Sequence, residues 1–371
     1  MKPVSLLITL CCMLCLSGCW DNKNIQELLY VSAIGVDYKN DLYEVYIQSV
    51  NFNNVAKSES GGGGNGPQVY VGKGKGKSLA LALGDIYNTV QRRIYWSHVR
   101  SYLFTENAMQ SGGENYFDNL KRYREFRYTP WIFGTKGSIE DIFKAPSFFQ
   151  LSPITNILGQ PEDNYLQKSF VKPLLAQEYQ INLNEPGETA IVPTLSIDKT
   201  TWQSDKDKKS EDKLKINGAF VVRKSGFQGW MANNQLNGLR WMEKETSRSP
   251  IEIKPAIISL EKPKPKIMVT EQGGNPIFNI EVKVRGNIVE LRDSHPSEQE
   301  MEKEAEDQIK KEIRSTFEEG LRINADIYNF RNVMFKKKMK NWQDIELTSS
   351  SLNRIDVHVY IQHTGELKKA L

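Results

Sequence analysis

The chain has 371 residues, of which 39% are hydrophobic and 25% are charged, and its formal net charge is +4. This balance is typical of a globular protein, and so small a positive charge argues against a nucleic-acid partner. Beyond the first 20 residues, no apolar run reaches the roughly 20 residues that a membrane-spanning helix needs. The length predicts two or three domains.

The first residues have the layout of an export signal. Lys2 supplies a positive start, residues 4–15 are apolar, and Leu16-Ser17-Gly18-Cys19 closes the run. The apolar part is too short for a membrane span, which favours a signal peptide. A cysteine at the cleavage point resembles the bacterial lipobox, in which the thiol receives a diacylglycerol. We therefore expect a mature chain that begins at a lipidated Cys19; the alternative is an ordinary signal peptide with an incidental cysteine.

The other cysteines carry no separate chemistry. Cys11, Cys12 and Cys15 lie within the expected signal peptide, so the mature chain keeps only Cys19. A Cys-x-x-Cys spacing indicates redox or metal chemistry in a cytosolic protein, but here it falls in a segment that is removed. The mature chain then has no internal disulfide, and its stability depends on burial of a core.

The first half of the chain alternates strand and helix patterns, which predicts mixed α/β layers. A β-hairpin with a polar turn comes first, and Ser78 is placed to cap the first long helix. The elements expected are strands at 28–36, 42–52, 68–71, 99–104, 130–134 and 190–197, a glycine-rich loop at 61–64, and helices at 78–93, 115–126 and 139–143, the last capped by Ser138.

A glycine- and lysine-rich segment precedes the helix at Ser78. Residues 72–78 read Gly-Lys-Gly-Lys-Gly-Lys-Ser and lie between a strand and a helix, as a phosphate-binding loop does. The spacing is wrong, because such a loop has four residues between its glycines and Gly72 and Gly76 enclose three. We therefore expect a flexible basic turn and no nucleotide site.

The second half of the chain contains two segments that suit edges or linkers. Residues 205–213 have mixed charge and predict a solvated hairpin tip or a domain linker. Residues 262–266, Lys-Pro-Lys-Pro-Lys, suit a sheet edge or a linker. The elements expected around them are strands at 216–222, 251–260, 278–284, 288–291 and 355–362, a turn at Gly286-Asn287, and helices at 235–245 and 332–342.

The longest helix is expected to begin near Pro296, with Ser297 and Glu300 as a capping box. Its apolar residues recur every four positions and form a narrow stripe, while the rest of its surface is charged. The stripe consists of Met301, Ala305, Ile309, Ile313, Phe317 and Leu321. This helix and its neighbours predict a β-β-α-α-β unit, with an antiparallel or mixed sheet and helices on one side.

No constellation of residues indicates catalysis or metal binding. The histidines are His98, His295, His358 and His363, without a His-Glu-x-x-His motif. His358 and His363 are spaced to point to opposite faces of a strand. There is no Gly-x-Ser-x-Gly motif, and the carboxylates are scattered. We expect no enzyme activity, no metal and no cofactor.

Several motifs, taken in order, resemble one family. The N-terminal ones are Gly18-Cys19-Trp20-Asp21 and Val-Ser-Ala-Ile-Gly-Val-Asp at 31–37. The later ones are Arg-Ile-Tyr-Trp-Ser-His at 93–98, a helix end at 120–127, Gly-Ala-Phe-Val-Val at 218–222, Gly229-Trp230, and Asp-Ile-Tyr-Asn-Phe at 326–330. This order resembles the C-subunit lipoproteins of bacterial spore germinant receptors, the Ger(x)C family. The family commonly has glycine near Asn329, and this chain departs from it.

The resemblance implies an α+β fold with three mixed α/β domains, each a sheet packed by helices, which agrees with sequence breaks near 200 and 265. The expected segments are a lipoprotein signal peptide at 1–18, an N-terminal mixed α/β domain at 19–200, a middle domain at 201–265 and a C-terminal β-β-α-α-β domain at 266–371.

The resemblance also implies a non-enzymatic receptor subunit at the outer face of the spore inner membrane. It would act with two integral membrane subunits, one of them transporter-like. Tyr95, Trp96, Ser97 and His98 are either an interaction surface or a buried junction between a helix and a strand, and packing is the commoner role for such aromatic residues. A second function stays open, in which the lipid-anchored protein itself captures a small ligand.

Overall fold

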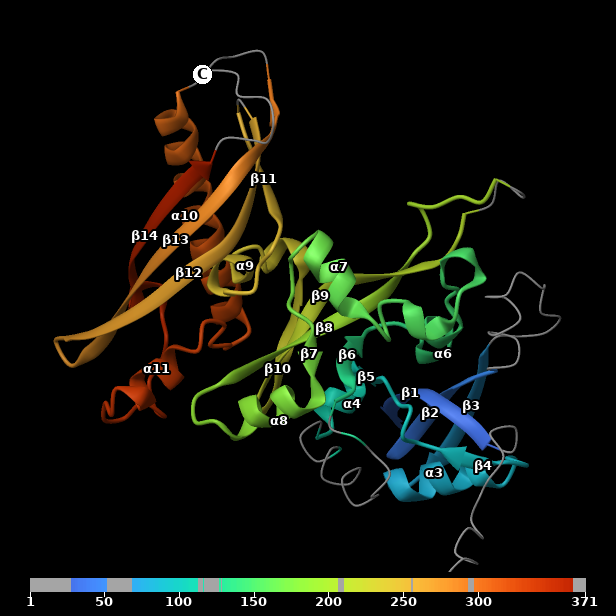
Figure 1. Ribbon diagram of the computed structural model, residues 1–371. Helices are drawn as coiled ribbons and strands as arrows, with labels where there is room; N and C mark the ends of the chain where they lie inside the picture. Colours follow the sequence, from blue (N-terminus) through green and yellow to red (C-terminus); the bar gives the residue numbers. More distant parts are fainter. Residues whose placement is uncertain are drawn as a thin grey trace, which may run out of the picture.

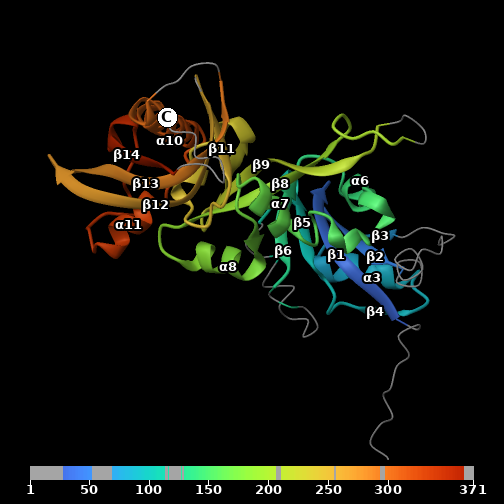
Figure 2. The ribbon, with the colours of Figure 1, turned by 45° about the horizontal axis from the view of Figure 1, so that its top comes forward.

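The computed structural model describes residues 28–51, 69–112, 116, 127, 129–205, 210–254, 256–292 and 297–362. Helices and strands are arranged around two β-sheets, which confirms the expected α+β class. Figures 1 and 2 both place the four-stranded sheet at one end of the molecule and the first strands of the ten-stranded sheet at the other. Within the described residues, no helix has the length and apolar character needed to cross a bilayer.

The ten-stranded sheet has the order β10-β9-β8-β6-β5-β1-β2-β3, with β4 paired to β1 and β7 paired to β6. Its strands are β1 (Leu28–Lys39), β2 (Leu42–Val50), β3 (Val69–Gly76), β4 (Arg93–Tyr95), β5 (Ser101–Thr105), β6 (Trp131–Thr135), β7 (Leu174–Leu175), β8 (Thr189–Asp198), β9 (Lys213–Arg223) and β10 (Gly226–Ala232). The expected hairpin at 28–52 and the strands at 130–134 and 190–197 are thus confirmed.

Helices cover both faces of this sheet. Helices α3 (Leu79–Tyr87) and α8 (Ala176–Asn184) pack on one face, and helix α6 (Ile139–Lys144) packs on the other. We call the cluster under α3 and α8 the N-terminal core. The remaining helical segments are α4 (Glu106–Gln110), α7 (Pro161–Gln167), η2 (Phe148–Gln150) and η3 (Pro153–Thr155). The expected loop at 61–64 lies outside the described residues, as does the helix at 115–126 apart from Tyr116.

Two of the predicted helix starts are confirmed, but one predicted helix is too long. Ser78 Oγ accepts a hydrogen bond from the Leu81 amide, and Ser138 Oγ accepts one from the Asp141 amide. The helix expected over 78–93 ends at Tyr87, and Ile94 belongs to strand β4. The apolar spacing continued beyond the helix because Ile94 is buried in the same N-terminal core as the helix residues.

The glycine- and lysine-rich segment is a strand and not the flexible turn that we expected. Residues 72–76 form most of β3, which pairs antiparallel with β2. The glycines face α3, and a Cβ atom at Gly74 would lie 2.1 Å from the Ala82 carbonyl oxygen. Only glycine permits so close an approach of helix and strand. Glycine therefore serves packing here, a role that the local sequence does not reveal.

Strand β9 joins the two halves of the molecule. It pairs antiparallel with β8, from Thr189 opposite Arg223 to Asp198 opposite Lys213. The segment at 205–213 therefore leads from β8 into β9, which agrees with a hairpin, one of the two alternatives we expected. The boundary expected at 200 lies within this connection, and the boundary at 265 lies inside a strand of the second sheet. Strand pairing thus divides the chain into two sheets, the first ending with β10 and the second beginning with β11.

The second sheet has the order β11-β12-β13-β14. Its strands are β11 (Ser249–Ile253), β12 (Ala256–Gln272), β13 (Asn275–Leu291) and β14 (Leu352–Gln362), with α9 (Leu239–Met242), α10 (Glu298–Arg322), α11 (Phe330–Lys336), η4 (Asn233–Gln235) and η5 (Ser349–Ser351) around it. The helices expected at 235–245 and 332–342 are both shorter than predicted. We call the cluster between this sheet and α10 the C-terminal core.

The long hairpin of β12 and β13 corrects two sequence predictions and agrees with a third. Residues 251–260 form two strands, since β11 turns back at Lys254 to pair with β12. Residues 262–266 lie within β12, at a register shift beyond the end of β11, where a sheet edge tolerates proline. Gly286 and Asn287 lie inside β13, and a Cβ at Gly286 would meet the Ser259 carbonyl oxygen at 2.4 Å. The true turn is Gly273-Gly274, whose φ angles of 60° and 82° favour glycine.

Helix α10 and strand β14 close the second sheet as the sequence predicts. Ser297 and Glu300 form the expected capping box, and the apolar stripe from Met301 to Phe317 is buried in the C-terminal core. Strand β14 pairs in parallel with β13, which makes the sheet mixed. Glu306 and Glu302 of α10 accept hydrogen bonds from the Val359 and Ile361 amides of β14. These glutamates accept hydrogen bonds from backbone amides of an edge strand, which have no neighbouring strand to pair with.

Asn329 adopts a backbone conformation that favours glycine. Its φ of 58° and ψ of 38° are left-handed, a conformation that asparagine tolerates better than most residues. Its Oδ1 accepts a hydrogen bond from the Thr189 amide, and its Nδ2 donates one to Glu188 Oε2, each at 2.9 Å. The side chain therefore links α11 of the C-terminal half to β8 of the large sheet.

Substitution of Gly74 tests the close approach of α3 to β3. Gly74→Ala should lower the free energy of unfolding by about 2–3 kcal/mol, because the new methyl group would overlap backbone. Gly84→Ala, in α3 itself, meets nothing within 4 Å and is the matched control. It should raise stability by about 0.5–1 kcal/mol through helix propensity. Equal melting temperatures for the two variants would contradict the described packing.

Substitution of Asn329 separates its hydrogen bonds from its backbone conformation. Asn329→Gly should lower stability by about 1–2 kcal/mol, because two hydrogen bonds are lost while glycine keeps the left-handed geometry. Asn329→Ala should cost about 1–2 kcal/mol more, since alanine disfavours that geometry. Urea unfolding of the two variants measures the difference. An alanine variant as stable as the glycine variant would show that the conformation costs nothing.

Candidate functional site

The candidate residues Tyr95, Trp96, Ser97 and His98 lie beside the start of β1 in the ten-stranded sheet. Cys19 lies outside the described residues. Strand β4 pairs in parallel with the first residues of β1, with Leu28 opposite Arg93 and Tyr30 opposite Tyr95. Because side chains alternate along a strand, Arg93 and Tyr95 share one face and Ile94 lies on the other. The segment 95–98 is therefore adjacent to the start of the fold.

The four candidate residues divide between the two roles we considered. Trp96 is 4% exposed and packs in the N-terminal core, as a buried junction requires. Tyr95 is 37% exposed, and His98 is also exposed. Ser97 is partly buried, and its hydroxyl group has no hydrogen-bond partner among the described residues. Tyr95 and His98 thus lie at the surface, while Trp96 holds the segment in place.

An aromatic group surrounds these exposed side chains. The rings of Tyr30 and Tyr95 meet edge to face, with centroids 5.6 Å apart. His98 lies 5.2 Å from Tyr30 and 5.3 Å from Tyr95 by ring centroids. Such stacking stabilises the three rings against one another and fixes their arrangement on the surface. Sequence analysis did not single out Tyr30, because its position beside Tyr95 depends on strand register.

Positive charges lie beside the aromatic group. Partial burial, together with the nearby guanidinium groups of Arg127 and Arg100, lowers the pKa of His98. Both guanidinium groups therefore disfavour a further positive charge on the imidazole ring. Arg93, Arg100 and Arg127 are all exposed. We call Tyr30, Arg93, Tyr95, His98, Arg100 and Arg127 the aromatic-basic surface.

The lysines of the glycine-rich strand are already engaged by a carboxylate. Lys73 and Lys75 lie 2.8 Å and 2.7 Å from the Glu44 carboxylate, which Tyr46 also contacts. Burial works to raise the pKa of Glu44, but the hydrogen bonds from Lys73, Lys75 and Tyr46 prevail and lower it to about 2. The paired, extended backbone of β3 offers no cradle of free amides to a phosphate.

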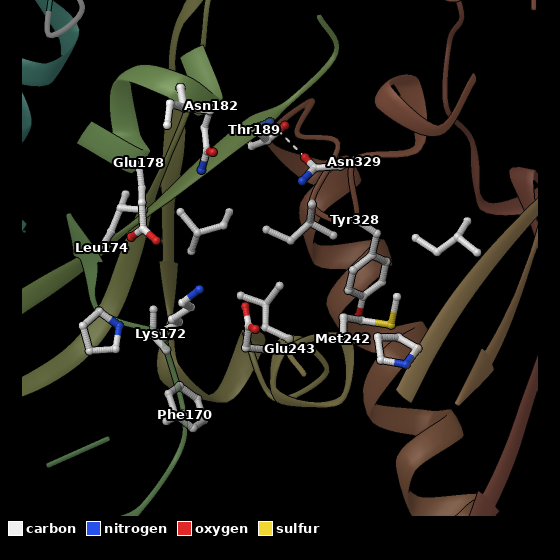
Figure 3. A pocket seen from close by; sticks show the side chains of 18 of the residues that line it. Phe170, Lys172, Leu174, Glu178, Asn182, Thr189, Met242, Glu243, Tyr328 and Asn329 are labelled. Carbon is white, nitrogen blue, oxygen red and sulfur yellow. Dashed lines mark hydrogen bonds between the residues drawn. The ribbon is translucent and has the colours of Figure 1, made fainter. Parts of the chain in front are cut away.

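A pocket of about 500 Å³ lies between the two halves of the molecule. Its residues come from the segment before α8, from α8 and β8, and from α9, β12 and α11. Figure 3 shows Lys172, Glu178 and Glu243 on one side of it and Tyr328 on the other. Lys172 Nζ lies 3.0 Å from Glu245 Oε2. The pocket combines apolar walls with both signs of charge, and sequence analysis gave no signal for it.

The described residues contain no group of three or more histidine, cysteine, aspartate or glutamate side chains that could hold a metal ion. His98 lies in the turn between β4 and β5 of the ten-stranded sheet, and His358 lies in β14 of the four-stranded sheet. His295 and His363 lie outside the described part of the chain.

Two family models match the chain in order. One is described as the spore germination protein N-terminal domain and matches residues 21–197. The other is described as spore germination B3/GerAC like, C-terminal, and matches residues 217–365. The gap between them falls at the connection of β8 and β9.

Individual relatives agree with these models. The chain is 25% identical to spore germination protein KC of Bacillus subtilis (strain 168), over 98% of this chain and 96% of that protein. It is 21% identical to spore germination protein B3 of the same organism, over 78% and 75% of the two chains. The crystal structure of the GerBC protein shares the fold, with a TM-score of 0.54 at 15% identity over 88% of this chain and 96% of that one. Because the two family models together span most of the sequence in order, the protein belongs to the Ger(x)C family of spore germination proteins.

Proposed function

We propose that this protein is a lipid-anchored, non-enzymatic subunit of a nutrient germinant receptor that is needed for spore germination. The observation that carries the proposal is the succession of the two germination family models along the chain, behind a lipobox-like Leu16-Ser17-Gly18-Cys19. The names of its relatives, spore germination proteins KC, B3 and A3, support the same role.

The proposed anchor is a diacylglyceryl group on Cys19, which becomes the first residue of the mature chain. Each buried methylene group contributes about 0.8 kcal/mol to membrane binding, so one acyl chain holds marginally and two hold firmly. This places the protein at the outer face of the spore inner membrane. In the receptor it acts beside two integral membrane subunits, one of them transporter-like, and without a catalytic step of its own.

The two sheets suit a subunit that transmits or organises contacts. In the sequence, only residues 20–27 separate the proposed anchor from β1 of the ten-stranded sheet. The four-stranded sheet lies at the other end of the molecule from β1. The two ends are connected by β9, whose side chains lie in both cores, and by the hydrogen bond between Asn329 and the Thr189 amide. A partner bound at one end is thereby held at a fixed position relative to a partner at the other.

The anchor is tested by substitution of Cys19. Cys19→Ala should abolish lipidation and move the protein from the membrane to the soluble fraction, because no thiol remains to accept the lipid. Fractionation is performed in a strain that lacks the partner subunits, so that retention by them is excluded. Ser17→Ala, next to the cleavage point, should leave the protein lipidated and is the control. Continued membrane retention of Cys19→Ala in that strain would sink the proposed anchor.

A second candidate function is direct capture of a small ligand, and the pocket between the halves favours it. Its volume of about 500 Å³ is of the size that small-molecule sites have. Lys172 offers a cation, and Glu178 and Glu243 offer carboxylates, a set that suits a ligand with both charges. Against it, Lys172 already pairs with Glu245, so a ligand must compete with an existing ion pair.

Calorimetry distinguishes this function from the first. The purified chain of residues 20–371 is titrated with a panel of amino acids and sugars. Direct capture predicts binding that Lys172→Met weakens by roughly tenfold or more, through loss of one charge-assisted hydrogen bond. Lys224→Met, at an exposed position that does not line the pocket, should leave binding unchanged. Absence of binding heat across the panel would remove the second function and leave the receptor-subunit function intact.

A further inference from the structure

A second cavity, of about 490 Å³, lies beside α7 and is also of the size that small-molecule sites have. Its walls come from α7 and the segment after it, from β9, and from the chain between η4 and β11. Figures 1 and 2 both show α7 beside β9. The cavity borders the pocket between the halves, because Phe170 and Val171 line both. Since four asparagines line it, we call it the amide pocket: Asn164, Asn233, Asn234 and Asn237.

The charged side chains that line the amide pocket are all cations. They are Lys168, Lys215 and Arg240, and the described lining residues include no aspartate or glutamate. Arg240 is neutralised, because its Nη2 donates to both oxygens of the Glu312 carboxylate, at 3.0 Å and 2.8 Å. Lys215 Nζ lies 3.4 Å from Asp198 Oδ2, which is a long contact. Lys168 is exposed and has no ion pair with any residue that the structure describes. The pocket therefore has a positive charge, which comes mainly from Lys168.

Three of the four asparagine side chains have no partner in the described part of the chain. Asn233 is engaged, since its Nδ2 donates to the Ile216 carbonyl oxygen at 2.9 Å. The amide groups of Asn164, Asn234 and Asn237 make no hydrogen bond to a described residue. Each such group has two N–H donors and an acceptor oxygen. Together with Lys168 they supply the donors that the oxygens of a carboxylate or phosphate group require.

The rest of the wall is apolar and partly aromatic. It includes the rings of Tyr165 and Phe170 and the side chains of Leu214 and Ile216. A free inorganic anion would contact only the polar part of this cavity. A ligand that covers the whole wall has an apolar body attached to its anionic group, as the mixed lining of small-molecule sites requires.

The segment that carries Phe170 is firmly held, so this wall is formed before a ligand binds. Ser169 is 1% exposed, and its backbone amide donates to the Arg248 carbonyl oxygen at 2.8 Å. Its Oγ accepts a hydrogen bond from the Ser247 amide, and its carbonyl oxygen accepts one from Ser249 Oγ, each at 2.9 Å. A wall that is already ordered reduces the entropy that binding has to overcome.

We propose that the amide pocket binds a small organic anion, with a carboxylate or phosphate group on an apolar body and no amino group. The lysine and amide side chains bind the anionic group, and the aromatic wall contacts the body. An ammonium group would meet no carboxylate here, whereas the pocket between the halves offers Glu178 and Glu243. The proposal goes beyond the receptor-subunit function and depends neither on a lipid at Cys19 nor on ligand capture in the other pocket.

The test is calorimetric titration of the chain of residues 20–371 with four probes that share a phenyl ring. This chain keeps every described element, because the first begins at Leu28. Phenylacetate and phenyl phosphate are anionic, phenethyl alcohol is neutral and phenethylamine is cationic. At one fixed ionic strength, the better anion should bind roughly tenfold or more tightly than the alcohol, and the amine should bind least. The ratio of the two anions distinguishes a carboxylate from a phosphate ligand.

Two matched variants locate the binding. Lys168→Met should weaken binding of the anions by roughly tenfold and leave binding of the alcohol unchanged, because only the anionic group needs the ammonium group. Lys172→Met, the same substitution in the other pocket, should leave binding of the anions unchanged. Asn234→Ala, at an exposed position, should weaken anion binding several-fold. Melting temperatures confirm that all three variants are folded.

Every other result contradicts the proposal. If neither anion binds more tightly than phenethyl alcohol, or if phenethylamine binds as tightly as the anions, the proposed ligand class is wrong. If Lys168→Met and Lys172→Met weaken anion binding equally, net charge and not the amide pocket is responsible. If Lys172→Met alone weakens it, the anions bind between the halves, and the assignment to the amide pocket fails. None of these results bears on Cys19, whose lipidation is tested separately by fractionation.

Discussion

Strand β9 is buried on both of its faces, and each face belongs to a different core. Ala219 and Val221 pack against the C-terminal core, while Phe220 and Val222 pack in the N-terminal core. Since side chains alternate along a strand, one short segment supplies apolar surface to both halves. Neither half can bury its full core without the other, so the arrangement of the two sheets is fixed by a strand that contributes side chains to both cores.

Strand β9 gives the start of β1 a rigid relation to the C-terminal half of the molecule. The sheet continues from β9 through β8, β6 and β5 to β1, where the aromatic-basic surface lies. A displacement of the C-terminal sheet cannot be absorbed by a flexible linker between domains. It has to be resisted by the packing of β9 or passed along the hydrogen-bonded strands to β1.

The elements that could be predicted from the sequence are those fixed by neighbouring residues. Serine caps at Ser78, Ser138 and Ser297 and the apolar stripe of α10 depend on contacts within a few positions, and all were found. Gly74 and Gly286 were misread as loop and turn residues. Each is a glycine because a distant backbone oxygen, of Ala82 and of Ser259, comes too close for a side chain. Periodicity carries no information about such approaches.

The candidate site also combines residues that a local sequence pattern reveals with residues that only the fold brings together. Tyr95, Trp96 and His98 stand out as aromatic residues in one short segment, and a sequence can reveal that. Tyr30 and Arg127 join them only through strand pairing and tertiary contact, across separations that no local pattern records. The motif at 326–330 was found, but the link that Asn329 makes between the halves follows only from its hydrogen bonds to Glu188 and Thr189.

The parallel pairing of β13 and β14 has a consequence for the order in which the chain folds. Residues 292–351, including α10 and α11, lie between the two strands, so β13 has one open edge until this crossover is complete. Pairings over such separations form slowly, and an open edge can meanwhile pair with another chain. The C-terminal sheet is thus the segment most exposed to aggregation during biogenesis. The arrival of β14, whose outer amides are taken by Glu302 and Glu306, ends that vulnerability.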